Sequence, residues 1–315
     1  MKIRVAAVLV GLLCAGCLAP RQRRSAIDWE AIVTRYDAAA MAYATPLFPP
    51  LDPAPVRVRL YRRRSEIPGG TLSAHLRRGN AWADLSRNEV HLPVWRAGKT
   101  RDDDARAPLR MLRHELAHLH LHRATAFLLP PPMAALFGTD RLPTAPWWVH
   151  EGWAAHIEDA PLVDGRVQPP SVNLERLREL QRLIRSGRCP NPWDVLSKPA
   201  SATGNSAEAA VAWGLVHALL YPVDTRKRAE SRDLFGHYLR ACRRGFYPDG
   251  EDPTAAFAAE FLDPQGRPAF DWWRRWDQRV TREGDAWFRR LFAGNLSDDD
   301  WAEAWREHMQ SLSPL

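Results

Sequence analysis

The sequence is poor in lysine, in cysteine and in long apolar runs, and each shortage narrows the kinds of protein it can be. The only lysines are Lys2, Lys99, Lys198 and Lys227. Arginine therefore supplies nearly all the positive charge behind the formal net charge of +7. Acidic runs such as Asp102–Asp104 interrupt the basic positions, and no nucleic-acid-reading motif accompanies them. We therefore expect no nucleic-acid partner, and the charge supports only weak attraction to anionic surfaces.

The one long apolar run lies at the N-terminus and is too short to span a membrane as a mature helix. It covers Val5–Leu13 and follows the positive residues Lys2 and Arg4. A short apolar run behind positive charge and ahead of small residues is typical of a secretory signal peptide. The sequence therefore predicts a signal peptide over 1–17 and a polar tether over 18–25.

The end of this signal, Ala15-Gly16-Cys17, resembles a bacterial lipobox, although Cys14 stands where leucine is usual. The resemblance implies that Cys17 becomes the lipidated first residue, so that the protein is held on a membrane without crossing it. Leu18 follows in place of the aspartate that retains lipoproteins at the inner membrane. We expect a cell-envelope protein, on the periplasmic face of the outer membrane if the cell has two membranes. Ordinary cleavage, leaving a secreted protein, is the alternative.

Only two of the four cysteines lie beyond this signal, at Cys189 and Cys242. In an oxidising compartment they could form one disulfide, or they could be two unrelated thiols. Their spacing does not decide between these alternatives, and we assign them no catalytic role.

The order of the predicted elements indicates a small sheet followed by helices. Apolar residues alternate with arginine over 56–60, which predicts a half-buried strand, and a turn at 86–88 joins a hairpin over 81–94. The sequence therefore predicts an α+β fold, with one domain over 26–292 and a helical tail over 293–315. Helices are expected at 26–44, 108–122, 146–159, 173–186, 207–220, 228–243, 252–261, 270–292 and 298–310, with a proline-rich loop at 130–146. The long apolar stretch between Arg123 and Pro146 is a potential lid or specificity loop.

The segment His114–His118 reads HELAH and predicts a metal site. Residues four apart share one face of a helix, so His114 and His118 can bind the same ion. Glu115 lies to the side, where its carboxylate can take a proton from a water on the metal. Five residues with two wildcards also occur by chance, so this motif needs a second element.

The segment 146–155 supplies that element, because it predicts a helix start that carries Glu151. Catalytic zinc takes three protein ligands and keeps a position for water, which two histidines and Glu151 would satisfy. His150 and His156 are rival third ligands, as is Glu158. Glu158 shares a helix face with Glu151, and we expect it to be a solvated carboxylate at the helix end. The alternative is that Glu158 orients a metal-bound histidine.

The pair HELAH and PWWVHEGWAAHIE resembles the gluzincins, in particular bacterial peptidase MA-like proteins. In that group, strands precede HExxH and a Trp-x-x-Glu-Gly-x-Ala segment follows it, as His114–His118 and Trp148–Ala154 do here. The later AWGLVHALL also resembles a helix of such proteins, although Ala209 stands where a tyrosine is common. The resemblance implies a zincin-like domain, a Zn²⁺ cofactor held by His114, His118 and Glu151, and a peptide or protein substrate.

The function that we expect is a zinc-dependent metallopeptidase acting on envelope or extracellular peptides, with Glu115 activating the water on zinc. The alternatives are a membrane-anchored, inactive metal-binding or peptide-binding lipoprotein, and a structural lipoprotein in which HELAH is coincidental. The presence of Glu115 favours an active enzyme. A stabiliser of the oxyanion is expected opposite Glu115. The candidates, each of which could equally be a packing residue, are His156, His217, His237, Tyr221 and Tyr238.

Overall fold

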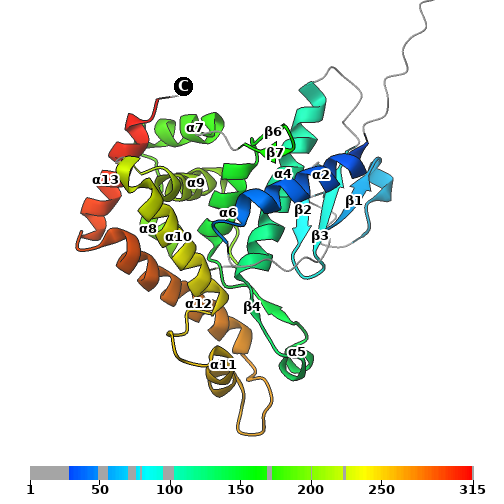
Figure 1. Cartoon of the computed structure of the whole chain (residues 1–315), viewed down its shortest axis with the longest axis vertical. Helices are drawn as coiled ribbons and strands as arrows, with labels where there is room; N and C mark the ends of the chain where they lie inside the picture. Colours follow the sequence, from blue (N-terminus) through cyan, green and yellow to red (C-terminus); the bar gives the residue numbers. More distant parts are fainter. Residues whose placement is uncertain are drawn as a thin grey trace, which may run out of the picture. The chain divides into compact units, whose positions relative to one another are not determined.

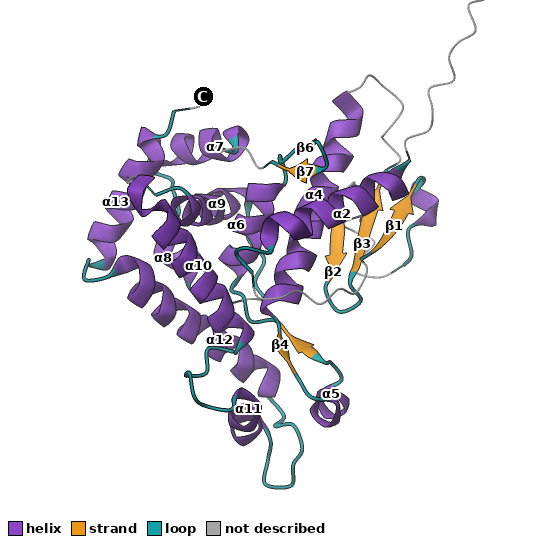
Figure 2. Ribbon diagram, in the orientation of Figure 1, coloured by secondary structure: helices purple, strands orange, loops and turns teal. Residues whose placement is uncertain are grey.

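One helix and then a small β-sheet precede a long succession of helices along the chain (Figures 1 and 2). This computed structural model describes residues 28–48, 56–69, 76–78, 80–94, 103–168, 172–199, 201–222 and 225–313. Residues 33–315 form one compact unit, whereas the first residues of the first described helix, up to Ile32, fall in another. The α+β prediction is confirmed: mostly helical, with small sheets. The predicted signal peptide, tether and Cys17 lie outside the described residues.

The sheet has three strands in the order β1-β3-β2: β1 (Arg57–Tyr61), β2 (Trp82–Asp84) and β3 (Glu89–Pro93). β3 is buried along its whole length, as the central strand should be, and pairs parallel with β1 and antiparallel with β2. The predicted strand and hairpin are therefore confirmed. β2 is left at the edge of this sheet, beside the helix that carries HELAH.

The helices follow the predicted order closely. They are α2 (Trp29–Ala44), α4 (Asp103–Thr125), α5 (Pro131–Phe137), α6 (Trp147–Ile157), α7 (Leu174–Arg185), α8 (Pro192–Leu196), α9 (Ser206–Leu220), α10 (Arg228–Arg243), α11 (Pro253–Phe261), α12 (Trp272–Phe288), continued by a π-helical turn (Arg289–Ala293), and α13 (Asp298–Ser311). Short 3-10 turns lie at Arg64–Glu66 and Thr225–Lys227. There are also two pairs of short strands: β4 (Phe127–Leu128) pairs with β5 (Arg141–Leu142), and β6 (Leu162–Val163) pairs with β7 (Arg166–Val167).

Helix α4 begins before the proline that was expected to start it. The sequence places Pro108 in the first turn, but the helix already runs from Asp103. A proline costs one backbone hydrogen bond to the preceding turn, and acidic residues at a helix N-terminus favour its formation there. The early start is consistent with Asp103 and Asp104 occupying that end.

The proline-rich loop expected at 130–146 is wrong, because this stretch contains α5 and half of the β4–β5 pair. The aromatic residues between Arg123 and Pro146 are buried against the C-terminal helices. Phe127 and Phe137 lie 5.4 Å and 5.2 Å, ring centroid to centroid, from Phe257 of α11. Phe137 also packs edge-on against Trp272 at 4.8 Å. These contacts fix the segment to α11 and α12, so the structure gives no support to a lid here.

Helix α6 lies between α4 and α9 and packs against both. Its approach to α9 is very close, since a Cβ added at Gly152 would lie 2.3 Å from the carbonyl oxygen of Ala212. Trp148, Trp153 and Trp213 are fully buried around this contact. The packing therefore fixes α6 on both sides, and with it the residues that α6 presents.

Two further predictions concern the membrane and the cysteines. Among the described helices, none combines the length and apolar character needed to cross a membrane. Cys189 and Cys242 are both free thiols, which decides between the two alternatives that their spacing left open.

Candidate metal centre

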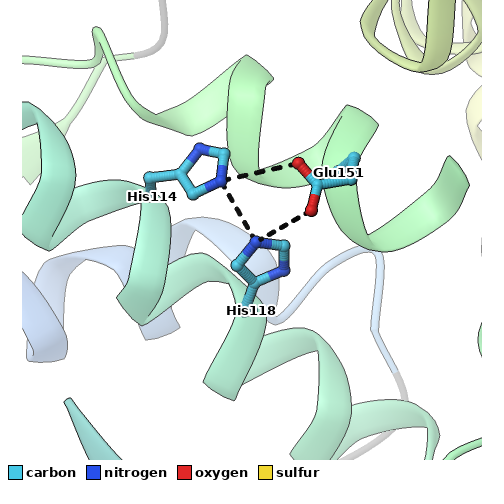
Figure 3. Close-up of side chains that lie close together, drawn as sticks. All are labelled: His114, His118 and Glu151. Carbon is cyan, nitrogen blue, oxygen red and sulfur yellow. Dashed lines mark hydrogen bonds and ion pairs between the residues drawn. The ribbon is translucent and has the colours of Figure 1, made fainter. Parts of the chain in front are cut away.

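Two adjacent helices bring the three predicted ligands together. His114 and His118 project from α4, and Glu151 projects from α6 toward both (Figure 3). The Nε2 atoms of the two histidines are 3.1 Å apart. The Glu151 carboxylate oxygens lie 3.7 Å from His114 Nε2 and 3.6 Å from His118 Nε2. The described residues thus form a compact triangle of two nitrogens and one carboxylate.

The dimensions of this triangle suit zinc. Ligand atoms about 2.0–2.1 Å from a tetrahedral zinc ion are about 3.3 Å from one another, and the three separations here lie close to that value. Two histidines and one carboxylate are also a common donor set for catalytic zinc. All three side chains are partly exposed, so the triangle opens on one side to solvent. The residues present therefore fit a zinc ion with one coordination position free.

Packing on the other faces of the two helices determines how the ligands point. On α4, Leu112, Leu116 and Leu119 are buried, which directs the opposite face toward the site. On α6, every residue is buried except Glu151. Glu151 is therefore the one residue of α6 whose side chain reaches both the site and solvent.

Glu158, just beyond the end of α6, holds His114 from behind. The His114 Nδ1 atom is 3.1 Å from a Glu158 oxygen. Because a carboxylate can only accept this bond, Nδ1 carries the hydrogen and Nε2 presents its lone pair to the site. The same carboxylate accepts hydrogen bonds from Arg110 at 2.6 Å, Arg176 at 3.1 Å and Asn173 at 3.0 Å.

The environment of Glu158 corrects the sequence interpretation. It is only 4% exposed, so the expected solvated carboxylate at the helix end is wrong. Burial alone would raise its pKa, but the hydrogen bond from His114 and the charges of Arg176 and Arg110 hold that pKa well below the usual range. Glu158 is therefore ionised and positions His114, the alternative that the helical spacing allowed.

Glu115 lies beside the triangle, half-buried. Burial, together with the nearby charge of Glu151, raises the pKa of its carboxyl group to about 7. His114 and the backbone of Ala83 act in the opposite direction and lower that pKa. A bound cation would lower this pKa again. Ala83 belongs to the edge strand β2, which therefore lies close to Glu115.

A cavity of about 470 Å³ opens over these residues. Its wall includes Asn80 and Ala81 just before β2, His114 and Glu115 on α4, and Arg176 on α7. A chain segment entering this cavity would therefore meet the residues that lead into the edge strand, the Glu115 carboxylate and one predicted metal ligand.

The oxyanion candidates do not lie with the triangle. His156 is five positions beyond Glu151, about 140° around the helix, so it faces away from the metal ligands. It instead lies 3.4 Å from the Tyr43 hydroxyl, and it is buried. His217 stacks on Trp213 and on Tyr221, with both centroid separations 5.0 Å. The placement of His156 and His217 as site residues is therefore not supported by any contact among the described residues.

The remaining candidates also have other environments. Tyr238 donates its hydroxyl hydrogen to the Gly284 carbonyl at 3.3 Å and packs on Trp148, and His237 is exposed on α10. His150, a rival third ligand, is buried near His118, with ring centroids 5.8 Å apart. Burial and His122 lower the pKa of His150 to about 3, so it is a neutral neighbour of the site.

Sequence reasoning missed the cations that hold Glu158. Arg110 lies four positions before His114, so helical spacing places it on the ligand face of α4 and could have indicated it. Arg176 and Asn173 come from the start of α7, and no local pattern links them to the site.

Comparison of the chain with protein-family models, with curated proteins and with solved structures gives no match. The geometry of the site is therefore the basis for a functional conclusion.

Proposed function

We propose that this chain is a zinc-dependent metallopeptidase of the kind its two motifs resemble. The observation that carries the proposal is the triangle of His114, His118 and Glu151, whose separations of 3.1–3.7 Å match the ligands of one tetrahedral zinc ion. The half-buried Glu115 beside it is the second requirement for hydrolysis, because a metal-binding protein without turnover has no need of a base at that place.

Each residue then has a defined task. His114, His118 and Glu151 hold the ion, and Glu158 fixes the ring orientation of His114. Zinc, when bound, lowers the pKa of a water molecule and polarises the carbonyl to be attacked. Glu115 accepts the proton of the attacking water and delivers it to the leaving amine, a task for which its carboxylate lies beside the ligand triangle.

A peptide is the proposed substrate class because of the edge strand. Among the described strands, none pairs with the outer side of β2, and its Ala83 backbone lies close enough to Glu115 to lower the pKa of that carboxyl group. An extended peptide can add to such an edge through its backbone and bring a carbonyl near the metal. We further propose that acylated Cys17 holds the enzyme on an envelope membrane, where peptides or proteins of the envelope are within reach.

The test measures zinc content and peptide hydrolysis in the wild-type chain, in two site variants and in one control variant, all of which carry Cys17→Ser. We expect about one zinc per wild-type chain, loss of zinc in Glu151→Ala, and retained zinc with at least about a hundredfold slower hydrolysis in Glu115→Gln. Glu179→Ala, an acidic helix residue away from the site, is the matched control for loss of a carboxylate. Absence of zinc from the reconstituted wild type would contradict the metal site. Zinc without hydrolysis of any member of a peptide library would instead support the inactive, metal-binding alternative.

A further inference from the structure

A second hollow lies where α2, β7, α9 and α10 meet. It has a volume of about 270 Å³. Its polar wall combines two arginines with two tyrosines. The lining residues are Tyr43, Val167, Gln168, Leu220, Tyr221, Arg228 and Arg232. None of them is acidic.

The two arginines are placed where their charge is unfavourable without a ligand. Arg228 and Arg232 lie one turn apart in the first turns of α10, the positive end of the helix dipole. No carboxylate among the described residues forms an ion pair with either of them. The Arg228 guanidinium lies 4.3 Å above the Tyr221 ring, which leaves its edge available to a further acceptor. The hollow therefore concentrates positive charge that the described protein does not neutralise.

The tyrosines add neutral hydrogen-bond donors. Both line the hollow, and the Tyr43 hydroxyl also lies 3.4 Å from His156 Nε2. Behind them, His217 is 1% exposed and its Nδ1 has no hydrogen-bond partner among the residues that the structure describes. Burial lowers the pKa of His156 to about 4 and that of His217 to about 3, so both are uncharged at neutral pH. The floor of the hollow thus offers no negative charge to compete with a bound anion.

We propose that this hollow is a binding site for a phosphate group. Two guanidinium groups and a tyrosine hydroxyl can bond at once to the several oxygens of a tetrahedral phosphate, whereas a carboxylate has only two oxygens to share among them. The phosphate belongs either to a soluble small molecule or to the headgroup of a lipid, and the two sources present the same chemistry to Arg228 and Arg232.

The hollow is distinct from the metal centre. The two sites use opposite faces of α6, with Glu151 on one and His156 behind the hollow on the other. The proposal therefore does not depend on the chain being a peptidase, and the metal content of each variant reports separately on that function.

The test uses calorimetric titration with inorganic phosphate of the full-length chain carrying Cys17→Ser, at constant ionic strength set with chloride. Each of Arg228→Gln and Arg232→Gln should weaken binding about tenfold or more, because each removes a charge-assisted contact. Tyr43→Phe, which keeps the ring and removes one donor, should weaken it less. Arg274→Gln, an exposed arginine of α12 paired with Asp271, is the matched control and should bind like the wild type. The titration is repeated after chelation, to separate phosphate bound at the metal.

A second arm measures sedimentation with vesicles of phosphatidylglycerol and of phosphatidylcholine, again without the lipid anchor. Phosphate binding that depends on the two arginines supports a soluble ligand. Binding to phosphatidylglycerol vesicles that depends on the same arginines, without affinity for free phosphate, supports a lipid headgroup. The proposal would be overturned if the chain bound neither free phosphate nor phosphatidylglycerol vesicles. It would also be overturned if Arg228→Gln and Arg232→Gln left the binding unaltered.

Discussion

At the scale of single residues, two carboxylates on one face of α6 have opposite electrostatic environments. Glu158 accepts hydrogen bonds from His114 and from two arginines, and its pKa is lowered. Burial raises the pKa of Glu151, against the lowering influence of His114 and Arg176. Glu151 faces the imidazoles with no arginine at ion-pair distance among the described residues. It is therefore the carboxylate whose ionised form needs a cation, which a metal ion would supply.

The positioning role of Glu158 can be tested by Glu158→Gln. The amide keeps the size of the side chain but removes the charge that fixes His114 Nδ1, and we expect about tenfold weaker zinc binding. The measurement is competition with a chelating dye. Glu175→Gln removes the charge of an exposed carboxylate that is also paired with Arg110, as Asp159 is, and is the control. Equal zinc affinity in the two variants would show that Glu158 pairs with the arginines but does not position His114.

Because His156 is buried and neutral, we expect the free energy of unfolding to fall as the pH becomes acidic. Because burial lowers its pKa from 6.5 to about 4, the unfolded chain binds more protons than the folded chain between these values. Stability due to this group is complete above about pH 6.5 and is lost as the pH falls toward 4. We expect the contribution of His156 to lower the free energy of unfolding by about 2 kcal/mol between pH 7 and pH 5.

The check is urea unfolding at both pH values, in the wild type, His156→Gln and His237→Gln. His156→Gln should lower stability at pH 7 but show a smaller further loss at pH 5. The exposed His237→Gln should follow the wild type. An unchanged pH dependence in His156→Gln would place the acid sensitivity elsewhere.

The sequence predicts some residues of the site better than others. The spacing of His114 and His118 is a property of any helix, so their convergence could be inferred directly. Glu151 lies on another helix, so it could be linked to them only by the need of catalytic zinc for a third ligand and by the resemblance to a known motif. Glu158 was misjudged because burial of a helix end depends on α4 and α7, which its own neighbours in the sequence do not reveal.

At the scale of elements, the contact between α6 and α9 requires a glycine. A methyl group at Gly152 would lie 2.3 Å from the Ala212 carbonyl oxygen and 2.6 Å from a methyl group of Val216. Both atoms belong to packed helix, so α6 would have to move away from α9. Because Glu151 is the adjacent residue, such a movement would also displace a proposed metal ligand.

We expect Gly152→Ala to destabilise the fold by about 1–3 kcal/mol and to weaken zinc binding. Gly69→Ala is the control, since its added methyl group meets no atom within 4 Å. Urea unfolding and zinc titration of both variants test the prediction. If Gly152→Ala matched Gly69→Ala in both measurements, the close approach of α6 and α9 would have no energetic importance.

Elements with strong periodicity were predicted with accurate bounds, and those that depend on distant contacts were not. The helix predicted over 228–243 is α10 to the residue, because a clear apolar stripe identifies it. The stretch 130–146 contains α5 and β5, although its prolines favour a loop. Burial of Phe137 against α11 and α12 stabilises that structure, and such a contact has no local signature.

At the scale of the whole molecule, the metal would link α4 to α6, two helices separated by the α5 segment. An ion that binds only when both helices are in place stabilises the folded chain, by about 2.7 kcal/mol at a free zinc concentration one hundred times the Kd. We expect chelation to lower the melting temperature of the zinc-loaded wild type by several degrees. Scanning calorimetry with and without chelator measures it. In Glu151→Ala the chelator should have no effect, and a fall of the same size there would mean that it acts on another part of the chain.

The two free thiols make this chain a convenient host for site-specific probes. Cys242 is buried, and burial raises the pKa of Cys189 to about 11, so neither presents much thiolate to a maleimide at neutral pH. In a chain without Cys14 and Cys17, a cysteine introduced at exposed Glu175, on the wall of the cavity, would be the preferred position for a fluorescent dye. The emission of that dye would then report directly on ligands entering the cavity.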